Sequence, residues 1–300
     1  SFQENYRYNT SWTWTNTLTW NQTFGEHSIK ALVGTEGIRN YARGFWGRRT
    51  NYYLTNPGNL TVDPDLWTLT FGPPPGQTTG NLNVNNETLI DRDNPSLPIQ
   101  SALYSQFGRV DYSFADKYLL SGTLRRDGSS VFDPDERWGM FPSVTAGWRI
   151  SREKFFQPVT WVNELKLRGG WGKLGSISNI NTTNSFTLYN QLAASSYYDI
   201  GGNNNSSTLG IYNSQIGNVG TTWEEDIVTN IGFDASVMNS KLDISLEWYK
   251  KSISGLLFRA DGATALTGGA TLPFINSGNI QNTGIDASVV YHGKVASDFN

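Results

Sequence analysis

The sequence alternates between apolar and polar side chains over runs of about ten residues, and this period of two is its most constraining feature. In the first run Trp12, Trp14 and Trp20 alternate with threonines. Successive side chains of a β-strand point to opposite faces, so each run predicts a strand with one apolar and one polar face. About ten residues is also the length of a tilted strand that crosses a membrane. The pattern therefore predicts an all-β fold whose strands have two unlike faces.

Nine such runs can be placed along the chain, and two further observations favour a membrane barrel over a soluble sandwich. Charged residues such as Arg168 and Glu247 fall in mid-strand on the polar face, as a water-filled lumen permits. Tryptophan and tyrosine are expected near strand ends, where the aromatic girdles of membrane barrels lie (Tyr112, Tyr118, Trp148, Trp171 and Trp248). The nine runs lie near residues 11–22, 27–41, 102–114, 117–127, 139–150, 163–174, 225–238, 241–251 and 284–294.

The connections between the runs alternate in length. Residues 114–117 and 238–241 are tight links, whereas 42–101, 173–225 and 254–283 are long and rich in Gly, Asn and aromatic residues. Outer-membrane barrels have short periplasmic turns and long extracellular loops, which is the pattern seen here. We therefore predict a transmembrane antiparallel β-barrel.

An odd number of strands indicates a partial barrel. Complete bacterial single-chain barrels have an even number of strands, and an unpaired strand edge in lipid costs several kcal/mol for each exposed backbone group. We therefore expect these nine strands to form one part of a larger barrel.

The composition excludes several classes of function. The chain has 300 residues and no cysteine, which excludes disulfides, thiolate metal sites and a cysteine nucleophile. Only His27 and His292 are available for histidine chemistry. With 23 basic and 26 acidic residues, the chain lacks the positive charge that nucleic-acid binding requires. We expect no enzymatic activity, no cofactor, no metal site and no nucleic-acid partner.

Two groups of carboxylates are the alternatives to that expectation. Glu224, Glu225 and Asp226 are adjacent, and Asp133 and Asp135 flank a proline. Neither group has the spacing of a calcium-binding loop, and a glycosidase needs two carboxyl groups held across a sugar. We interpret both groups as solvated loop charge.

Several motifs occur along residues 104–290 in a fixed order. Residues 116–120 read Asp-Lys-Tyr-Leu-Leu, and 125–132 read Arg-Arg-Asp-Gly-Ser-Ser-Val-Phe. Residues 137–150 contain Phe141-Pro142 and end near Trp148. Further matching stretches are 165–172, 223–224, 230–234 and 276–286. Together they resemble the SusC/RagA family of TonB-linked outer-membrane proteins.

That resemblance implies an importer in the outer membrane of a Gram-negative bacterium. Such proteins have a 22-stranded barrel closed by an N-terminal plug, and a SusD-like surface lipoprotein covers the extracellular mouth. TonB, ExbB and ExbD supply the energy, and the substrates are oligosaccharides or peptides. On this interpretation residues 1–300 are part of the C-terminal barrel, with the plug and the TonB box outside this chain.

The motif residues are predicted to have structural roles at the stems of loops. Asp127-Gly128 is expected to form a tight turn where a strand ends, and Pro142 is expected near the start of the next strand. The motif residues in this group are Arg125, Asp127, Gly128, Ser129, Ser130, Phe132, Phe141, Pro142 and Trp148.

Aromatic residues in the long loops are the candidates for contact with a substrate or partner. Flat rings stack on sugar rings, although the same side chains also serve to pack a loop against itself or a lipoprotein. Two other functions remain open: a passive porin or surface-adhesive barrel, and a secreted all-β glycan-binding or glycan-active domain. The candidate contact residues are Trp46, Tyr52, Tyr53, Trp67, Tyr197 and Tyr198.

Overall fold

The computed structural model describes residues 2–49, 99–191, 197–199, 207–259 and 268–293. They fall into two compact units, residues 1–13 with 38–101 and residues 14–37 with 102–300. In the first unit, Ser11 Oγ donates a hydrogen bond to Asn40 Oδ1 at 2.7 Å. The polar clusters, the aromatic core and the loop stems described below lie in the second unit.

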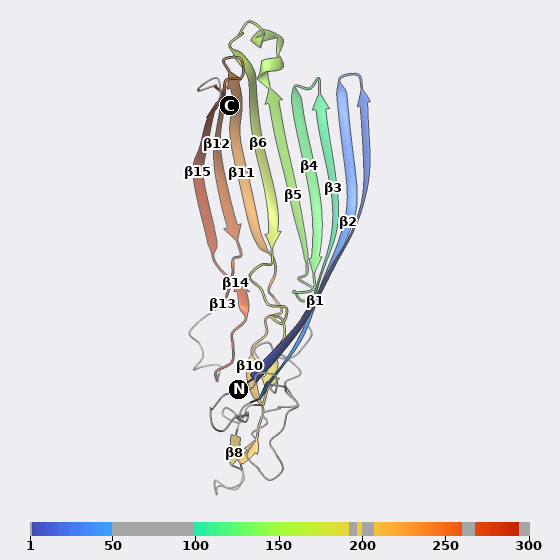
Figure 1. Cartoon of the computed structure of the whole chain (residues 1–300), viewed down its shortest axis with the longest axis vertical. Helices are drawn as coiled ribbons and strands as arrows, with labels where there is room; N and C mark the ends of the chain where they lie inside the picture. The colour runs from blue at the N-terminus through green and yellow to red at the C-terminus, as the bar shows by residue number, and fades with distance from the viewer. Residues whose placement is uncertain (1, 50–98, 192–196, 200–206, 260–267, 294–300) are drawn as a thin grey trace, which may run out of the picture. The chain divides into compact units, whose positions relative to one another are not determined.

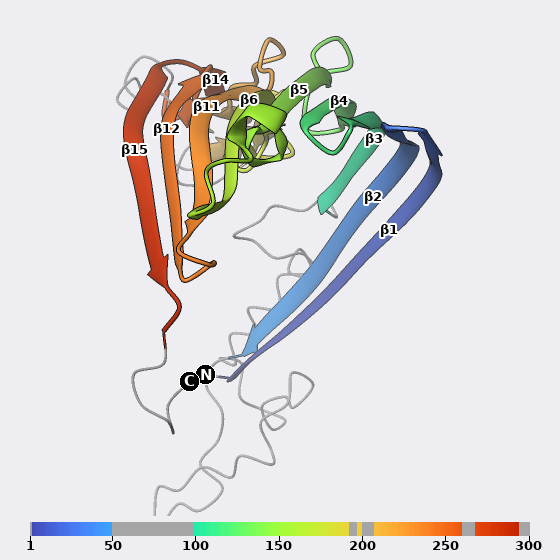
Figure 2. The same cartoon turned by 90° about the horizontal axis from the view of Figure 1, so that it is seen from above.

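The main sheet has nine antiparallel strands in the order β1-β2-β3-β4-β5-β6-β11-β12-β15 (Figure 1). The nine predicted strands are therefore confirmed. Viewed from above, the run from β15 to β3 keeps the same order (Figure 2). Their bounds are β1 Phe2–Phe24, β2 His27–Arg49, β3 Ile99–Phe114, β4 Tyr118–Ser129, β5 Trp138–Arg149, β6 Val162–Ser176, β11 Glu224–Val237, β12 Leu242–Ser254 and β15 Asn279–Tyr291.

Several strands extend further than the apolar pattern predicts. Strand β2 continues to Arg49, so residues 42–49 are not loop as expected, and β4 continues to Ser129. Asp127 and Gly128 are regular ladder residues of β4, paired with Ser105 and Tyr104, so the predicted tight turn is wrong. Backbone pairing needs no apolar side chain, and a ladder can therefore continue beyond the apolar part of a strand.

Pro142 also lies deeper in its strand than predicted. Strand β5 begins at Trp138, and Pro142 pairs with Leu124 of β4. The pairing of β5 with β6 begins only at Ser143. Pro142 therefore stands where β5 has a neighbour on one side only, a position that tolerates a residue without an N–H group.

The register places side chains in rungs that cross the sheet. One rung contains Tyr118, Trp148, Leu167, Phe233, Leu246 and Ala287; we call the face on which it lies the apolar face. The neighbouring rung, on the opposite or polar face, contains Leu119, Gly147, Arg168, Gly232, Glu247 and Asp286. The two predicted faces are thus present.

The two ends of the sheet differ in their connections. At one, the turn end, β3 and β4 are joined through Ala115 and Asp116, and β11 and β12 through residues 238–241, all tight turns with positive φ at Ala115, Asp116, Met238, Asn239 and Ser240. Neighbouring turns are linked by backbone hydrogen bonds, such as Ala115 N to Glu26 O at 2.7 Å. Residues 150–161, with two short 3₁₀ helices, η2 (Ile150–Arg152) and η3 (Lys154–Phe156), join β5 to β6 at this end.

The opposite, or loop, end carries the longer connections and the short strands within them. The described parts contain β7 Leu188–Asn190, β8 Tyr197–Asp199, β9 Ser207–Leu209, β10 Tyr212–Gln215, β13 Leu257–Arg259 and β14 Phe274–Asn276, which pair as β7 with β10, β8 with β9 and β13 with β14. The predicted alternation of short and long connections is confirmed with one exception, because residues 130–137 between β4 and β5 at this end are fewer than residues 150–161 at the turn end. No helix in the described ranges has the length and apolar character needed to cross a membrane.

Candidate functional site

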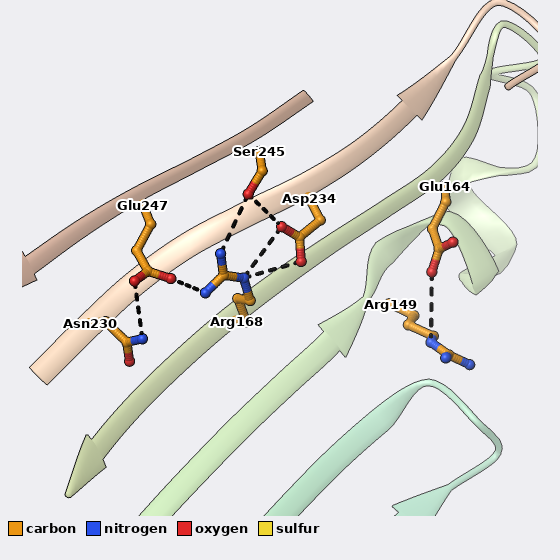
Figure 3. Close-up of polar contacts among 7 residues, drawn as sticks. All are labelled: Arg149, Glu164, Arg168, Asn230, Asp234, Ser245 and Glu247. Carbon is orange, nitrogen blue, oxygen red and sulfur yellow. Dashed lines mark hydrogen bonds and ion pairs between the residues drawn. The ribbon is translucent and has the colours of Figure 1, made fainter. Parts of the chain in front are cut away.

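The polar face carries a cluster of charged side chains from three adjacent strands, which we call the Arg168 cluster (Figure 3). Arg168 Nε in β6 donates to Asp234 Oδ2 in β11 at 3.1 Å, and its Nη1 forms an ion pair with Glu247 in β12. Ser245 Oγ donates to Asp234 Oδ1 at 2.8 Å, and Asn230 Nδ2 donates to Glu247 Oε1 at 3.3 Å. One guanidinium thus lies between two carboxylates, leaving the cluster with a net negative charge.

A glycine makes this arrangement possible. Gly232 of β11 occupies the rung position between Arg168 and Glu247, so no side chain separates the guanidinium from the carboxylate. A Cβ atom at Gly232 would lie 2.5 Å from Leu246 O and 3.0 Å from Glu247 Cα. The backbones of β11 and β12 therefore approach each other so closely here that any other residue would force them to shift.

The ion pairs in the Arg168 cluster fix the positions of its side chains but contribute little to the stability of the fold. The side chains of Arg168 and Asp234 are 31% and 41% exposed. Ion pairs with this exposure contribute at most about 1 kcal/mol each. The cluster therefore presents a defined set of donors and acceptors on the polar face.

Two shallow grooves lie beside the cluster. One, of about 310 Å³, is lined by polar and apolar residues (Ser121, Thr145, Lys166, Arg168 and Asn230, with Leu119, Leu120, Ala146, Gly147, Gly169 and Gly170). The other, of about 540 Å³, is lined by three carboxylates and several serines (Glu164, Asp234, Asp243, Ser236, Ser240, Ser245 and Ser288, with Ala235, Ile244 and Val290). Hydroxyl, amide and charged groups of this kind suit a hydrated wall that contacts polar solutes or a polypeptide. No group of three or more His, Asp or Glu side chains in the described residues is arranged to hold a metal ion.

The apolar face is bounded by aromatic residues on two levels. At the turn end, the rings of Tyr118 and Trp148 stack with centroids 6.4 Å apart. At the other level, Trp171 and Trp248 lie inside β6 and β12, and the next residues on the same face are Lys173 and Lys250. The prediction that Trp171 and Trp248 stand at strand ends is wrong. They mark the edge of the apolar band, beyond which the strands continue.

A glutamate at the turn end ties these aromatic residues together. Glu153 accepts hydrogen bonds from Tyr118 Oη at 2.6 Å, Trp148 Nε1 at 3.2 Å and Lys117 Nζ at 3.1 Å. These bonds favour the ionised form and so hold the pKa of the Glu153 carboxyl below its ordinary value. The bond from Tyr118 has the largest effect. Glu153 lies five residues after Trp148 in the sequence, outside the alternating runs. The alternating pattern therefore does not indicate that Glu153 binds Tyr118 and Trp148.

The motif around Asp127 forms a second polar cluster, towards the loop end. Arg125 Nε donates to Asp127 Oδ1 at 2.8 Å, and Arg125 Nη2 donates to Ser105 Oγ at 2.8 Å. Asp127, Gly128 and Ser129 are buried, and the exposed Ser130 accepts a hydrogen bond at Oγ from Ala102 N at 2.8 Å. The motif thus joins the end of β4 to Ala102 and Ser105, near the start of β3.

An aromatic core begins with Phe132, the last residue of that motif. The rings of Phe132 and Phe141 each lie 5.3 Å from Trp223, and all three side chains are buried. Trp223 Nε1 donates to Arg137 O at 3.0 Å, so its polar atom is satisfied. Trp223 belongs to a family-like stretch, but its packing against residues about ninety positions earlier cannot be inferred from spacing.

Asparagine side chains connect the long loops to one another. Asn184, which is buried, donates to Thr221 Oγ1 at 3.0 Å and accepts from Phe274 N at 2.7 Å. Asn276 Nδ2 donates to Thr222 O at 2.9 Å. The stem of the connection between β6 and β11 is therefore joined to that between β12 and β15.

The acidic triplet at the start of β11 is part of the same stems. Glu224 is buried and accepts a hydrogen bond from Leu257 N at 3.1 Å. Glu225 pairs with Lys173, and Asp226 pairs with Lys251 at 3.0 Å. The interpretation of these residues as solvated loop charge is wrong, because each has a defined partner on a neighbouring segment.

The predicted contact residues fall largely outside what the structure describes. Tyr52, Tyr53 and Trp67 lie outside the described residues. Trp46 is in β2, and Tyr197 and Tyr198 are in β8, but only their backbone placement is described. Their proposed contact with a substrate or partner stays a prediction.

Comparison with known proteins agrees with the two-faced sheet. The family model for the TonB dependent receptor-like β-barrel matches residues 1–300. This chain belongs to that family. The receptor barrel is 31% identical over 209 residues to the TonB-dependent receptor SusC of Bacteroides thetaiotaomicron, a match that covers 69% of this chain and 20% of SusC. It is 33% identical over 188 residues to TonB-dependent receptor P39 of Formosa agariphila, covering 63% of this chain and 17% of P39.

The fold of the receptor barrel also matches solved structures. The RagAB peptide transporter superposes with a TM-score of 0.75 at 23% identity, covering 96% of this chain and 28% of that chain. At this identity the likeness establishes the fold alone. The matched segments span about a fifth of the length of SusC and P39. The resemblance to the SusC/RagA family predicted from the motifs is confirmed.

Proposed function

We propose that this chain forms part of the barrel wall of an outer-membrane importer, which takes up nutrient oligosaccharides or peptides in a Gram-negative bacterium. The observation that carries the proposal is the division of one sheet into an apolar face, with Leu167 and Leu246, and a polar face with the Arg168 cluster. Lipid on one side and enclosed water on the other is the environment that such a wall requires.

The proposal includes the other parts of the machine. A plug domain and a TonB box outside these residues would close and couple the barrel, and TonB, ExbB and ExbD would supply energy. A SusD-like lipoprotein would cover the loop end. The kinship with SusC and the fold shared with the RagAB peptide transporter support this assignment. Trp46, Tyr52, Tyr53, Trp67, Tyr197 and Tyr198 are proposed to contact the substrate or the lipoprotein.

The test uses the full-length gene in its own host. Strains that lack the gene, lack TonB or carry the intact system are grown on a panel of oligosaccharides and peptides as the only carbon source. We expect one substrate class to require both the gene and TonB. Uptake that needs the gene but not TonB would instead indicate a passive porin, and growth that is unchanged on every substrate would contradict import.

A second experiment examines the loop end. Residues 50–98 are replaced by a short Gly/Ser linker in the full-length protein, which leaves β2 and β3 intact. We expect the barrel to assemble normally while uptake, or co-purification of the surface lipoprotein, decreases. Unchanged uptake and unchanged co-purification would remove this loop from the proposal.

A further inference from the structure

The connection between β5 and β6 at the turn end presents large aromatic side chains to its surroundings. Phe155 is 66% exposed and Trp161 is 65% exposed. Phe155 packs edge-on against Trp148 of the apolar face, with ring centroids 6.5 Å apart. Trp148 in turn stacks on Tyr118. Residues 150–161 therefore continue the apolar face beyond the ends of the strands.

The same connection carries an excess of positive charge. Arg152, Lys154 and the nearby Arg149 and Lys117 face three carboxylates at this end, those of Asp116, Glu153 and Glu164. Arg149 and Arg152 share Asp116. In the part of the chain that the structure describes, Lys154 is exposed and forms no ion pair.

The carboxylates of Glu153 and Glu164 do not cancel the charge of Arg152 and Lys154. The Glu153 carboxylate accepts hydrogen bonds from Tyr118, Trp148 and Lys117, so it is turned towards the strands. The next carboxylate, Glu164, is on the polar face at 3.9 Å from Arg149. Lys154 is thus free to meet an anion, and the Arg152 side chain, although its Nη1 pairs with Asp116, is still 51% exposed.

We propose that residues 150–161 bind the headgroup of an anionic phospholipid in the membrane leaflet at the turn end. Phe155 and Trp161 enter the boundary between headgroups and acyl chains, and Arg152 and Lys154 bind the phosphate. Cations next to exposed aromatic rings are typical of segments that bind the membrane interface and prefer anionic lipids. Because the inference places a bilayer at this level, it rests on the proposed membrane function.

Native mass spectrometry of the full-length receptor in detergent tests the proposal. Delipidated protein is titrated with phosphatidylglycerol and, separately, with phosphatidylethanolamine. We expect preferential retention of phosphatidylglycerol, and we expect its apparent affinity to fall about fivefold for each cation removed. The variants are Lys154→Gln, which breaks no ion pair, and Arg152→Gln/Lys154→Gln.

A matched control removes two positive charges from the polar face. Lys166→Gln/Lys251→Gln changes net charge equally, and its positions face away from lipid. This control should keep the preference for phosphatidylglycerol. Equal retention of the two lipids by the wild type, or an unchanged preference in Arg152→Gln/Lys154→Gln, would overturn the lipid site and leave the importer intact. A receptor that stays monodisperse without detergent would overturn both.

Discussion

The guanidinium of Arg168 in β6 reaches the carboxylate of Glu247 in β12 across the whole width of β11. The side chain at the intervening rung position is that of Gly232, which leaves the path open. The same glycine lets β11 and β12 approach closely, because a Cβ there would lie 2.5 Å from Leu246 O. One residue thus serves both the backbone pairing and the polar wall.

The first prediction concerns this glycine. Gly232→Ala should destabilise the barrel by about 1–3 kcal/mol, because the methyl group meets backbone atoms that cannot move independently. The folded fraction of the full-length protein is measured by its heat-dependent electrophoretic mobility. Gly122→Ala in β4 is the control, since a Cβ there has no neighbour within 4 Å. Equal effects of the two substitutions would contradict the close approach.

The second prediction tests the assignment of the faces. Leu246→Lys places a charge on the apolar face and should cost about 2–4 kcal/mol if that face contacts the middle of a bilayer. Ser288→Lys, on the polar face of the neighbouring strand, adds the same side chain beside Asp234 and Asp243 and should be tolerated. Assembly into the outer membrane is compared for the two variants. If both assemble equally well, lipid does not cover the apolar face.

The third prediction concerns the loop stems. Asn184→Ala removes a buried amide and leaves Phe274 N and Thr221 Oγ1 without that partner. We expect the substitution to lower the stability of the loop stems by about 1–3 kcal/mol. Because these bonds join two loops and not two strands of the main sheet, the barrel should still assemble. Limited proteolysis should cut within 177–223 and 255–278 faster than in the wild type. Asn179→Ala, at an exposed position, is the control and should leave the rate unchanged.

The fourth prediction is a pH dependence at the turn end. Hydrogen bonds from Tyr118, Trp148 and Lys117 lower the pKa of Glu153 in the folded protein. The ionised carboxylate therefore adds stability above the ordinary glutamate pKa of 4.5, and this contribution is lost as the pH falls further, through the lowered pKa.

Glu153→Gln keeps the shape of the side chain and removes its charge. Urea unfolding of the reconstituted protein should show that the variant is less stable than the wild type at neutral pH. The difference between the two should shrink below pH 4.5. A difference that is constant across this range would show that the charge of Glu153 does not stabilise the turn end.

The outline of the sheet could be predicted from local pattern, but its contacts could not. Alternation places Leu246 and Glu247 on opposite faces whatever the neighbouring strands are, because the geometry of a single strand decides it. Alternation does not predict where a ladder stops, so it does not show that β2 continues to Arg49. Asp and Gly favour a turn locally, but the ladder with β3 continues through Asp127 and Gly128. Trp171 and Trp248 mark the edge of the apolar band and not the ends of β6 and β12, which local pattern does not distinguish.

The sequence alone determined the strands, their two faces and the family, because each of these is written in short stretches of neighbouring residues. Only the tertiary structure decided which residues meet across strands and loops. Arg168 and Glu247 are brought together by the register of three strands, Phe132 and Trp223 by the packing of two loops, and Asn184 and Phe274 by hydrogen bonds between segments ninety positions apart. Such pairings depend on the summed energy of many backbone and side-chain contacts, which no single stretch of sequence contains.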